Sequence, residues 1–310
     1  MTLMIDRYQG CLQGLAAGDA LGTTVEFQAP GTFKPMTDIV GGGVFALQPG
    51  QWTDDTSMAL CLAESLLAVQ AFDPADQMQR YVKWYREGAL SSTGRCFDIG
   101  NATREALHRY EASGEAYSGS EDPFSAGNGS IMRLAPVVMY YAEQPAEAIR
   151  YAALSSRTTH GAAECLAACR LLAAYILAGL HGWSKQEMLA PDAFREWLDE
   201  DTLTPHMLNI KQGSYKVKEP PQIQGSGYVV ESLEAALWAF HKSASFAEGA
   251  LLAVNLGNDA DTTGAIYGQI AGAYYGLSGI PAEWSRKLAL RELISDYAGR
   301  LFTERCNRRG

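Results

Sequence analysis

Two short turns in this chain combine residue types that hold cations. Residues 257–264 read Gly-Asn-Asp-Ala-Asp-Thr-Thr-Gly and precede an uncharged run. Residues 51–57 read Gln-Trp-Thr-Asp-Asp-Thr-Ser and also precede an apolar run. Asp and Thr before an apolar run are typical of a helix N-terminus, where backbone N–H groups favour negative charge. For either turn alone, a solvated capping turn is the alternative.

The donor types in these turns indicate which ion they suit. Neither turn contains a Lys or Arg, and bunched carboxylates repel one another and take up protons unless a cation joins them. Every donor is an oxygen atom, which suits Mg²⁺, Mn²⁺ or Ca²⁺ and disfavours zinc. Because both turns offer the same chemistry, we predict a divalent-cation site built from the two together.

Two glycine stripes are a separate reason to bring the turns together. Residues four apart share one helix face, and each interior Gly costs a helix about 1 kcal/mol relative to Ala. Close approach of two helices would offset that cost. We therefore expect the first helix and the late helix to pack tightly, with Glu26 carried toward the acidic turns. The stripes are Gly10, Gly14, Gly18, Gly22 and Gly264, Gly268, Gly272, Gly276.

Composition bounds the class of protein. The chain has 310 residues, 47% hydrophobic and 19% charged, which suits a folded globule. A net charge of -10 and a pI of about 5.0 argue against generic binding to nucleic acid or an anionic membrane. The six cysteines include no Cys-x-x-Cys pair. With no secretory signal at the N-terminus, we expect a cytoplasmic protein. The uncharged run 262–282 is weakly hydrophobic, so we expect a buried core helix there.

Helical patterns dominate, and no run of alternating β-branched residues favours a strand. We predict an all-α fold, a compact multi-helix bundle with long functional loops, in one domain over 1–310. Asp6 is the expected N-cap of the first helix. Residues 184–228 are more polar and contain four prolines, which indicates a lid or peripheral segment. Besides the late helix, the expected helices are 6–21, 56–69, 74–87, 102–112, 131–141, 145–155, 162–180, 229–240 and 245–254.

Six segments taken in order resemble the ADP-ribosylglycohydrolase family, which includes the dinitrogenase-reductase-activating glycohydrolases and the ADP-ribosyl-acceptor hydrolases. The match covers nearly the whole chain, and six motifs in register are highly specific. The resemblance implies an all-α, metal-dependent enzyme that removes ADP-ribose from a modified macromolecule. The segments are 14–22 with Glu26, 53–56, 127–133, 159–160, 227–231 and 258–264.

The resemblance also implies a metal site of two divalent cations, Mg²⁺ or Mn²⁺. With Glu26 close by, five carboxylates would face four positive charges. Such a site would orient the ribose and lower the pKa of a bound water that attacks the anomeric carbon. Glu26, Asp98 and Asp261 are the catalytic candidates. The implied ligands are Thr53, Asp54, Asp55, Asp259, Asp261 and Thr262.

Asp98 bears on the acceptor. It resembles an acidic residue that arginine-specific members place beside the ribose, where it would protonate the leaving group or hold a guanidinium. The alternative is an N-cap for the helix expected near Ala102. If Asp98 lines the pocket, ADP-ribosyl-arginine is the favoured substrate, ahead of ADP-ribosyl-serine and modified nucleic acid.

The remaining resemblance concerns ADP-ribose. Glycines before a helix let backbone N–H groups approach phosphates, although a plain helix-entry turn is the alternative for this loop. His160 is a binding candidate or a core residue, and Tyr228 stacks on adenine, gates the cleft or belongs to the core. The implied binding residues are Gly127, Asn128, Gly129, Ser130, Met132, His160 and Tyr228.

Two other functions stay open. One is a non-catalytic ADP-ribose-binding protein or an immunity protein that blocks a toxin, which the presence of Glu26 and the metal aspartates makes less favoured. The other is a two-metal phosphoesterase. The expected partners are an ADP-ribosylated protein as substrate and ADP-ribose as product, with no membrane.

Overall fold

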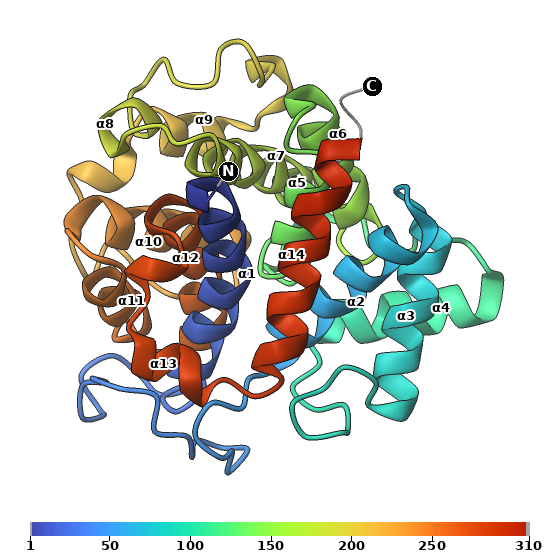
Figure 1. Ribbon diagram of the computed structural model, residues 1–310, viewed down its shortest axis with the longest axis horizontal. Helices are drawn as coiled ribbons and strands as arrows, with labels where there is room; N and C mark the ends of the chain where they lie inside the picture. The colour runs from blue at the N-terminus through green and yellow to red at the C-terminus, as the bar shows by residue number, and fades with distance from the viewer. Residues whose placement is uncertain (1, 308–310) are drawn as a thin grey trace.

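The computed structural model describes residues 2–307 of the chain, with side chains from 4 to 304. Within that range the fold is all-α, with fourteen α-helices, four short 3₁₀-helices and no sheet (Figure 1). The predicted fold class is therefore confirmed. That the whole chain forms a single domain stays a prediction.

Helices α1 (Thr2–Gly22) and α12 (Ala260–Tyr275) form the centre and lie side by side (Figure 1). A Cβ added at Gly14 would lie 2.4 Å from the carbonyl oxygen of Gly268, and one at Gly268 would lie 2.0 Å from that of Gly14. The backbones therefore touch, as the glycine stripes predicted. Gly22 faces Ala260, so the end of α1 meets the start of α12.

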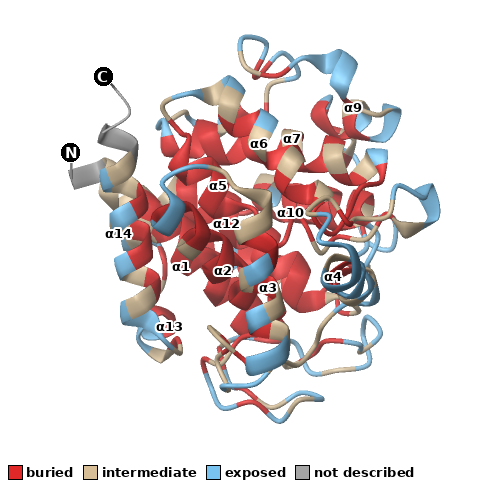
Figure 2. Cartoon of the chain, turned by 90° about the vertical axis from the view of Figure 1, so that its right-hand side faces the viewer, coloured by how far each residue is buried: buried red, intermediate tan, exposed pale blue. Residues whose placement is uncertain are grey.

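The other long helices surround this pair. Helices α7, α10 and α11 pack on α12, while α14 packs on α1. Figure 2 shows the buried residues concentrated in α1, α2, α5 and α12. The bounds are α2 (Asp54–Val69), α3 (Pro74–Glu87), α4 (Asn101–Ser113), α5 (Ala135–Tyr140), α6 (Pro145–Arg157), α7 (Ala163–Leu180), α10 (Val229–Lys242), α11 (Phe246–Val254), α13 (Ala282–Lys287) and α14 (Arg291–Asn307).

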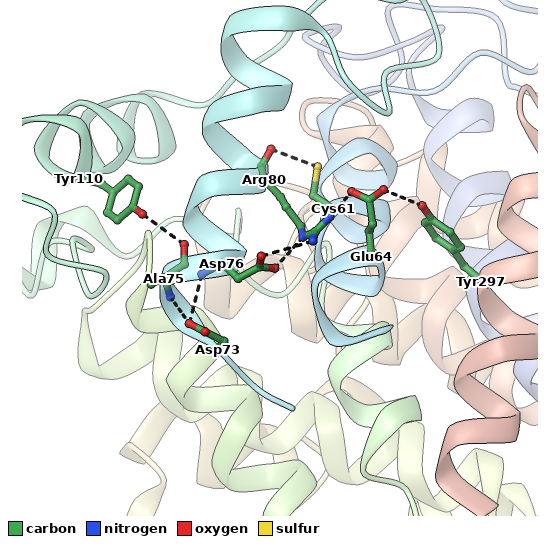
Figure 3. A network of polar contacts seen from close by, with 8 residues as sticks. All are labelled: Cys61, Glu64, Asp73, Ala75, Asp76, Arg80, Tyr110 and Tyr297. Carbon is green, nitrogen blue, oxygen red and sulfur yellow. Dashed lines mark hydrogen bonds and ion pairs between the residues drawn. The ribbon is translucent and has the colours of Figure 1, made fainter. Parts of the chain in front are cut away.

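A polar network fixes α2 between α3 and α14 (Figure 3). Arg80 of α3 donates to Glu64 of α2 and to Asp76 one turn earlier on its own helix. Tyr297 of α14 donates to the other oxygen of Glu64. Because Asp54 and Asp55 are the first residues of α2, these contacts also hold the acidic turn at residues 51–57 in place.

Residues 184–228 form short elements, with α8 (Lys185–Met188) and α9 (Pro205–Lys211) the two α-helices among them. The segment packs on α7 and α10 through buried side chains that include Met188, Ile210 and Tyr215. It lies on the outside of the bundle (Figure 1). Its function as a lid or peripheral lobe stays a prediction.

Three details differ from the sequence-based expectations. Asp6 does not cap α1, which begins at Thr2; its carboxylate accepts hydrogen bonds from the backbone and hydroxyl of Ser278 and so joins α1 to the turn after α12. The helix expected from Ile131 begins at Ala135, because residues 129–133 form turns. Helix α14 lies beyond the predicted elements.

Among the described residues, one helix, α7, has the length and hydropathy of a membrane span. Within that window 78% of the residues are buried inside the protein, and α7 packs on α6, α10 and α12, as a core helix does. Cys165 and Cys169 both lie in α7, where they are buried, and neither forms a disulfide. The uncharged run that starts at Thr262 forms most of α12, whose residues from Ala260 to Ala273 are all buried.

Candidate functional site

Carboxylates from four parts of the chain converge at the end of α1. Oxygen atoms of Glu26, Asp98 and Asp261 all lie within 4.8 Å of one another, and so do those of Asp19, Asp55 and Asp261. The helix contacts described above bring these parts together. We call six of the converging residues the acidic floor: Glu26, Asp54, Asp55, Asp98, Asp259 and Asp261.

Asp19 is a site residue that the sequence analysis did not select. It is fully buried, and its oxygens accept four hydrogen bonds from α2 and the residue before it. Thr53 donates through its backbone (2.8 Å) and hydroxyl (2.9 Å), and Thr56 through its backbone (3.1 Å) and hydroxyl (2.6 Å). Asp19 thus holds the turn that presents Asp54 and Asp55. The signal available for Asp19 in the sequence was a carboxylate within a helix that carries a glycine stripe.

The acidic floor has more acceptors than donors. The hydroxyl of Thr53 lies 2.9 Å from Asp19, 3.0 Å from Asp55 and 3.2 Å from Asp261, although it has one proton to donate. Oε2 of Glu26 and Oδ1 of Asp55 are buried with no hydrogen-bond partner. Buried acceptors without donors cost free energy, so this arrangement favours a bound cation.

Burial shifts the protonation of these groups. Removal from water and repulsion by neighbouring carboxylates raise the pKa of Asp54, Asp55 and Asp261 well above the ordinary value. The same causes, with Asp19 and Asp259 as the main neighbours, raise the pKa of Asp98 to about 7. The floor therefore holds protons or cations near neutral pH.

Asn128 links the acidic floor to the loop that contains Gly127 and Gly129, which we call the glycine loop. Its side-chain amide donates to Oδ2 of Asp259 at 2.7 Å and to the hydroxyl of Ser232 at 2.9 Å. The backbone of Asp259 donates to Gly225 at 3.0 Å. The acidic turn at residues 257–264 is thus fixed against the loops that precede α5 and α10.

A cavity of about 490 Å³ extends from the acidic floor to the glycine loop. No Lys or Arg is among its described lining residues. Phe27, Ile99 and Thr103 also line it, although the sequence analysis did not select them. Phe27 directly follows Glu26 and Ile99 directly follows Asp98, which was the available signal for these two. The predicted site residues in the lining are Glu26, Asp54, Asp98, Asp259, Asp261, Thr262, Gly127, Asn128, Gly129, Met132 and His160.

A buried guanidinium organises the side of the cavity formed by Gly129 and His160. Arg133 donates to the carbonyl of Gly129 at 2.5 Å and to the hydroxyl of Thr159 at 2.6 Å, and stacks on Tyr81. That hydroxyl lies 2.8 Å from Nδ1 of His160. Burial, together with Arg133, lowers the pKa of His160 to about 3, so the ring is neutral at physiological pH.

Two predicted binding residues lie outside the lining. The hydroxyl of Ser130 is buried and accepts from Ser156 at 2.8 Å. Tyr228 is 37% exposed and precedes α10. Its backbone forms a bridge with Gly127 beside the cavity. Thr53 and Asp55 lie behind the lining, where the former hydrogen-bonds the latter.

The alternative interpretation of Asp98 is wrong. Helix α4 begins at Asn101 with Gly100 as its N-cap, so Asp98 does not cap it. The backbone of Asp98 is instead left-handed, with φ 57°, and its carboxylate lies in the acidic floor. Such backbone in a non-glycine residue is uncommon and concentrates at functional sites.

Within an all-α bundle, the acidic floor brings carboxylate and hydroxyl oxygens together, which is the donor set that Mg²⁺ or Mn²⁺ prefers. Comparison with known proteins gives the family. The ADP-ribosylglycohydrolase family model matches residues 1–310. The chain belongs to the ADP-ribosylglycohydrolase family, and it is an enzyme, a glycosidase among the hydrolases.

Individual relatives agree with this assignment. The chain is 47% identical to the ADP-ribosylarginine hydrolase Tri1 of Pseudomonas putida, over 96% of this chain and 78% of the relative. It is 33% identical to the ADP-ribosyl-[dinitrogen reductase] glycohydrolase of Rhodospirillum rubrum, over 92% and 91%. A solved ADP-ribosylglycohydrolase-related protein complex contains a chain of 47% identity that superposes with a TM-score of 0.87, over 98% of this chain and 100% of that one.

Proposed function

We propose that this enzyme cleaves the bond between ADP-ribose and the guanidinium group of an arginine side chain in a modified protein. Relatives at 47% and 44% identity are named ADP-ribosylarginine hydrolases, which supports arginine as the acceptor. The observation that carries the proposal is the convergence of buried carboxylates in a cavity with no Lys or Arg among its described lining residues. The products are ADP-ribose and the unmodified protein.

The donor set fits two divalent cations, Mg²⁺ or Mn²⁺. All donors are oxygen atoms, and two of them, Oε2 of Glu26 and Oδ1 of Asp55, are buried without a partner. When bound, the cations would polarise a water molecule and the ribose hydroxyls. With Glu26, the carboxylates would balance four positive charges. The ligands would be Thr53, Asp54, Asp55, Asp259, Asp261 and Thr262.

Glu26 and Asp98 take opposite roles in the reaction. Water forms a bond to the anomeric carbon while the bond from that carbon to the guanidine nitrogen breaks, through an oxocarbenium-like state. Burial and neighbouring carboxylates raise the pKa of Glu26 to about 10, so Glu26 would need a nearby cation to be ionised and accept the proton that the water loses. Asp98 donates a proton to the departing nitrogen. Burial and neighbouring carboxylates raise the pKa of Asp98 to about 7, which suits a proton donor near neutral pH. Asp261 contacts both groups and orients them.

The side of the cavity formed by Gly127, Gly129 and His160 suits the pyrophosphate and adenosine. The glycines at 127 and 129 leave the backbone open to an approaching phosphate. The guanidinium of Arg133 lies directly behind Gly129, to whose carbonyl it donates, so the potential there favours an anion. His160 is neutral and lines the same end. ADP-ribose would thus lie with its ribose on the acidic floor.

Release of ADP-ribose from an ADP-ribosyl-arginine protein tests the proposal. The assay compares the parent, an Asp259→Ala, Asp261→Ala double variant and the control Asp192→Asn, which changes an exposed carboxylate outside the cavity. We expect release with Mg²⁺ or Mn²⁺ from the parent and the control. We expect none with chelator or from the double variant.

Other results would replace parts of the proposal. Cleavage of a serine-linked or nucleic-acid-linked substrate alone would overturn the acceptor. AMP or phosphoribose as product would mean phosphoester cleavage. ADP-ribose binding without release from any substrate would point to a non-catalytic reader or a toxin-blocking protein. A cytoplasmic location is a further proposal, supported by free buried thiols such as Cys165 and Cys169.

A further inference from the structure

Three phenylalanines gather at the open side of the acidic floor. The ring centroids of Phe27 and Phe45 lie 6.5 Å apart at an interplanar angle of 70°, and those of Phe45 and Phe97 lie 5.2 Å apart at 59°. They come from three separate loops, directly after Glu26, in the turn 42–47 and directly before Asp98. We call Phe27, Phe45 and Phe97 the aromatic lip.

One ring of the lip, that of Phe27, is exposed, whereas Phe45 and Phe97 are half-buried. Phe27 is 65% exposed and Val44 beside the lip is 61% exposed, and neither belongs to the described hydrophobic core. The backbone of Phe27 is left-handed, with φ 62°, a conformation that disfavours a bulky side chain. An exposed aromatic ring on left-handed backbone beside the cavity, as at Phe27, indicates a binding role.

Backbone contacts hold the lip in register with the acidic floor. The amide of Phe27 donates to Asn258 at 2.6 Å, and the amide of Asn258 donates to Gln28 at 2.7 Å. Gly42 and Leu47 exchange backbone hydrogen bonds of 2.8 and 2.9 Å that close the turn bearing Phe45. The position of Phe27 is therefore tied to the acidic turn at residues 257–264.

Phe27 lines the cavity at its acidic end, together with Glu26 and Asp98. If the ribose lies on the acidic floor and the pyrophosphate toward Gly129, the group leaving the anomeric carbon departs past these three residues. The lip therefore faces the acceptor and not the ADP-ribose. This inference rests on the proposed function.

We propose that the aromatic lip recognises the arginine side of the substrate, with the face of Phe27 against the guanidinium and the carboxyl group of Asp98 beside the nitrogen that leaves. A guanidinium is planar, delocalised and weakly hydrated, so it stacks on an aromatic ring, and the N–H groups at its edge can donate to a carboxyl oxygen. The partner is thus an arginine-bearing protein segment, which the exposed valine beside the lip also contacts.

Matched substitutions at Phe27 separate the effect of the aromatic ring from the effect of side-chain volume. Phe27→Leu keeps an apolar side chain on the same backbone, Phe27→Tyr keeps the ring, and Val217→Ala is a control at a site 87% exposed in the peripheral segment. The substrate is ADP-ribosyl-agmatine, which carries the guanidinium on a small molecule. Steady-state kinetics give kcat and KM, and calorimetry gives the Kd of ADP-ribose alone.

We expect kcat/KM to fall roughly 2- to 30-fold in Phe27→Leu, the range of a cation–π contact, mainly through KM. Phe27→Tyr and Val217→Ala should keep the parent value, and the Kd of ADP-ribose should be the same in all four proteins. An unchanged kcat/KM in Phe27→Leu would overturn the proposal. So would a parallel loss of ADP-ribose affinity, because Phe27 would then act through the ribose site.

Failure of the proposed function gives a different result. A parent protein that releases no ADP-ribose leaves ADP-ribosyl-agmatine intact, and the Kd of ADP-ribosyl-agmatine can then be measured directly by titration. Weaker binding by Phe27→Leu than by Phe27→Tyr would support the lip, and equal binding would overturn it. Loss of self-association in Phe27→Leu with unchanged kinetics would overturn it too, because a second copy of the chain would then cover the lip.

Discussion

The two ends of the cavity differ in how their charges are satisfied. The acidic floor gathers carboxylates with no Lys or Arg in the described lining, and leaves buried oxygens of Glu26 and Asp55 without partners. At the other end, Arg133 is buried among a carbonyl, hydroxyls, a thioether and an aromatic ring, with no carboxylate among its described contacts. One end therefore needs cations and the other attracts an anion, which matches a ribose on metals joined to a pyrophosphate.

This contrast also separates stability from function. The acidic floor costs stability until a ligand neutralises it. The guanidinium of Arg133 already donates to a carbonyl and a hydroxyl, although its Nε is buried without a partner. Substitutions at the two ends should consequently have opposite effects on the stability of the metal-free protein. The predictions below follow from that difference.

The largest effect is expected for Asp261→Asn. It removes a carboxylate that contacts both Glu26 and Asp98, and we expect ADP-ribose release to fall by about 10²- to 10³-fold, as for loss of one catalytic electrostatic group. In chelator the same variant should melt at a higher temperature than the parent, because one repelling buried charge is gone. A lower melting temperature in chelator would contradict an unsatisfied floor.

Arg133→Met tests the other end. It leaves the carbonyl of Gly129 and the hydroxyl of Thr159 without their donor, which costs about 2–4 kcal/mol of unfolding free energy in urea titrations. We expect the affinity for ADP-ribose to fall roughly tenfold, measured by calorimetry. Arg133→Lys should restore little, because one ammonium lacks the fork that reaches both acceptors. An unchanged Kd in Arg133→Met would show that this end does not shape the anion site.

The smallest effect concerns pH. Burial raises the pKa of Asp54, Asp55, Asp261 and, to about 7, Asp98. The folded state then binds more protons than the unfolded state, so stability is present at low pH and is lost as pH rises through the folded pKa values. For Asp98 this loss runs from about pH 4 to pH 7.

In chelator we therefore expect the melting temperature to be about 2–5 °C higher at pH 5.5 than at pH 8. Scanning fluorimetry across this range measures it. Saturating Mg²⁺ should cancel the trend, because cations compete with protons for the same oxygens. A melting temperature in chelator that rises with pH would mean that the carboxylates are already paired in the metal-free protein.

The sequence predicted much of the site because its signals are local. The Asp and Thr residues of each acidic turn, and the four-residue spacing of the glycines, are visible without the fold. Asp19 was missed because its four hydrogen-bond donors lie more than thirty residues away, in Thr53 and Thr56. The N-cap interpretation of Asp98 was plausible from local sequence. It failed because tertiary contacts, not helix capping, set the position of that side chain.

The sequence by itself determined the helical fold, the close contact of α1 with α12 and the oxygen-only chemistry, because periodicity, the absence of Cβ atoms and side-chain donor types are properties of the residues themselves. The tertiary structure alone decided the direction of the cavity, the burial of Arg133 behind Gly129 and the meeting of Phe27, Phe45 and Phe97. These depend on loops whose paths are set by hydrogen bonds between distant backbone groups, such as those joining Phe27 and Gln28 to Asn258. No local conformational preference encodes such contacts. They determine which side chains stand beside the acidic floor and therefore which substrate group meets it.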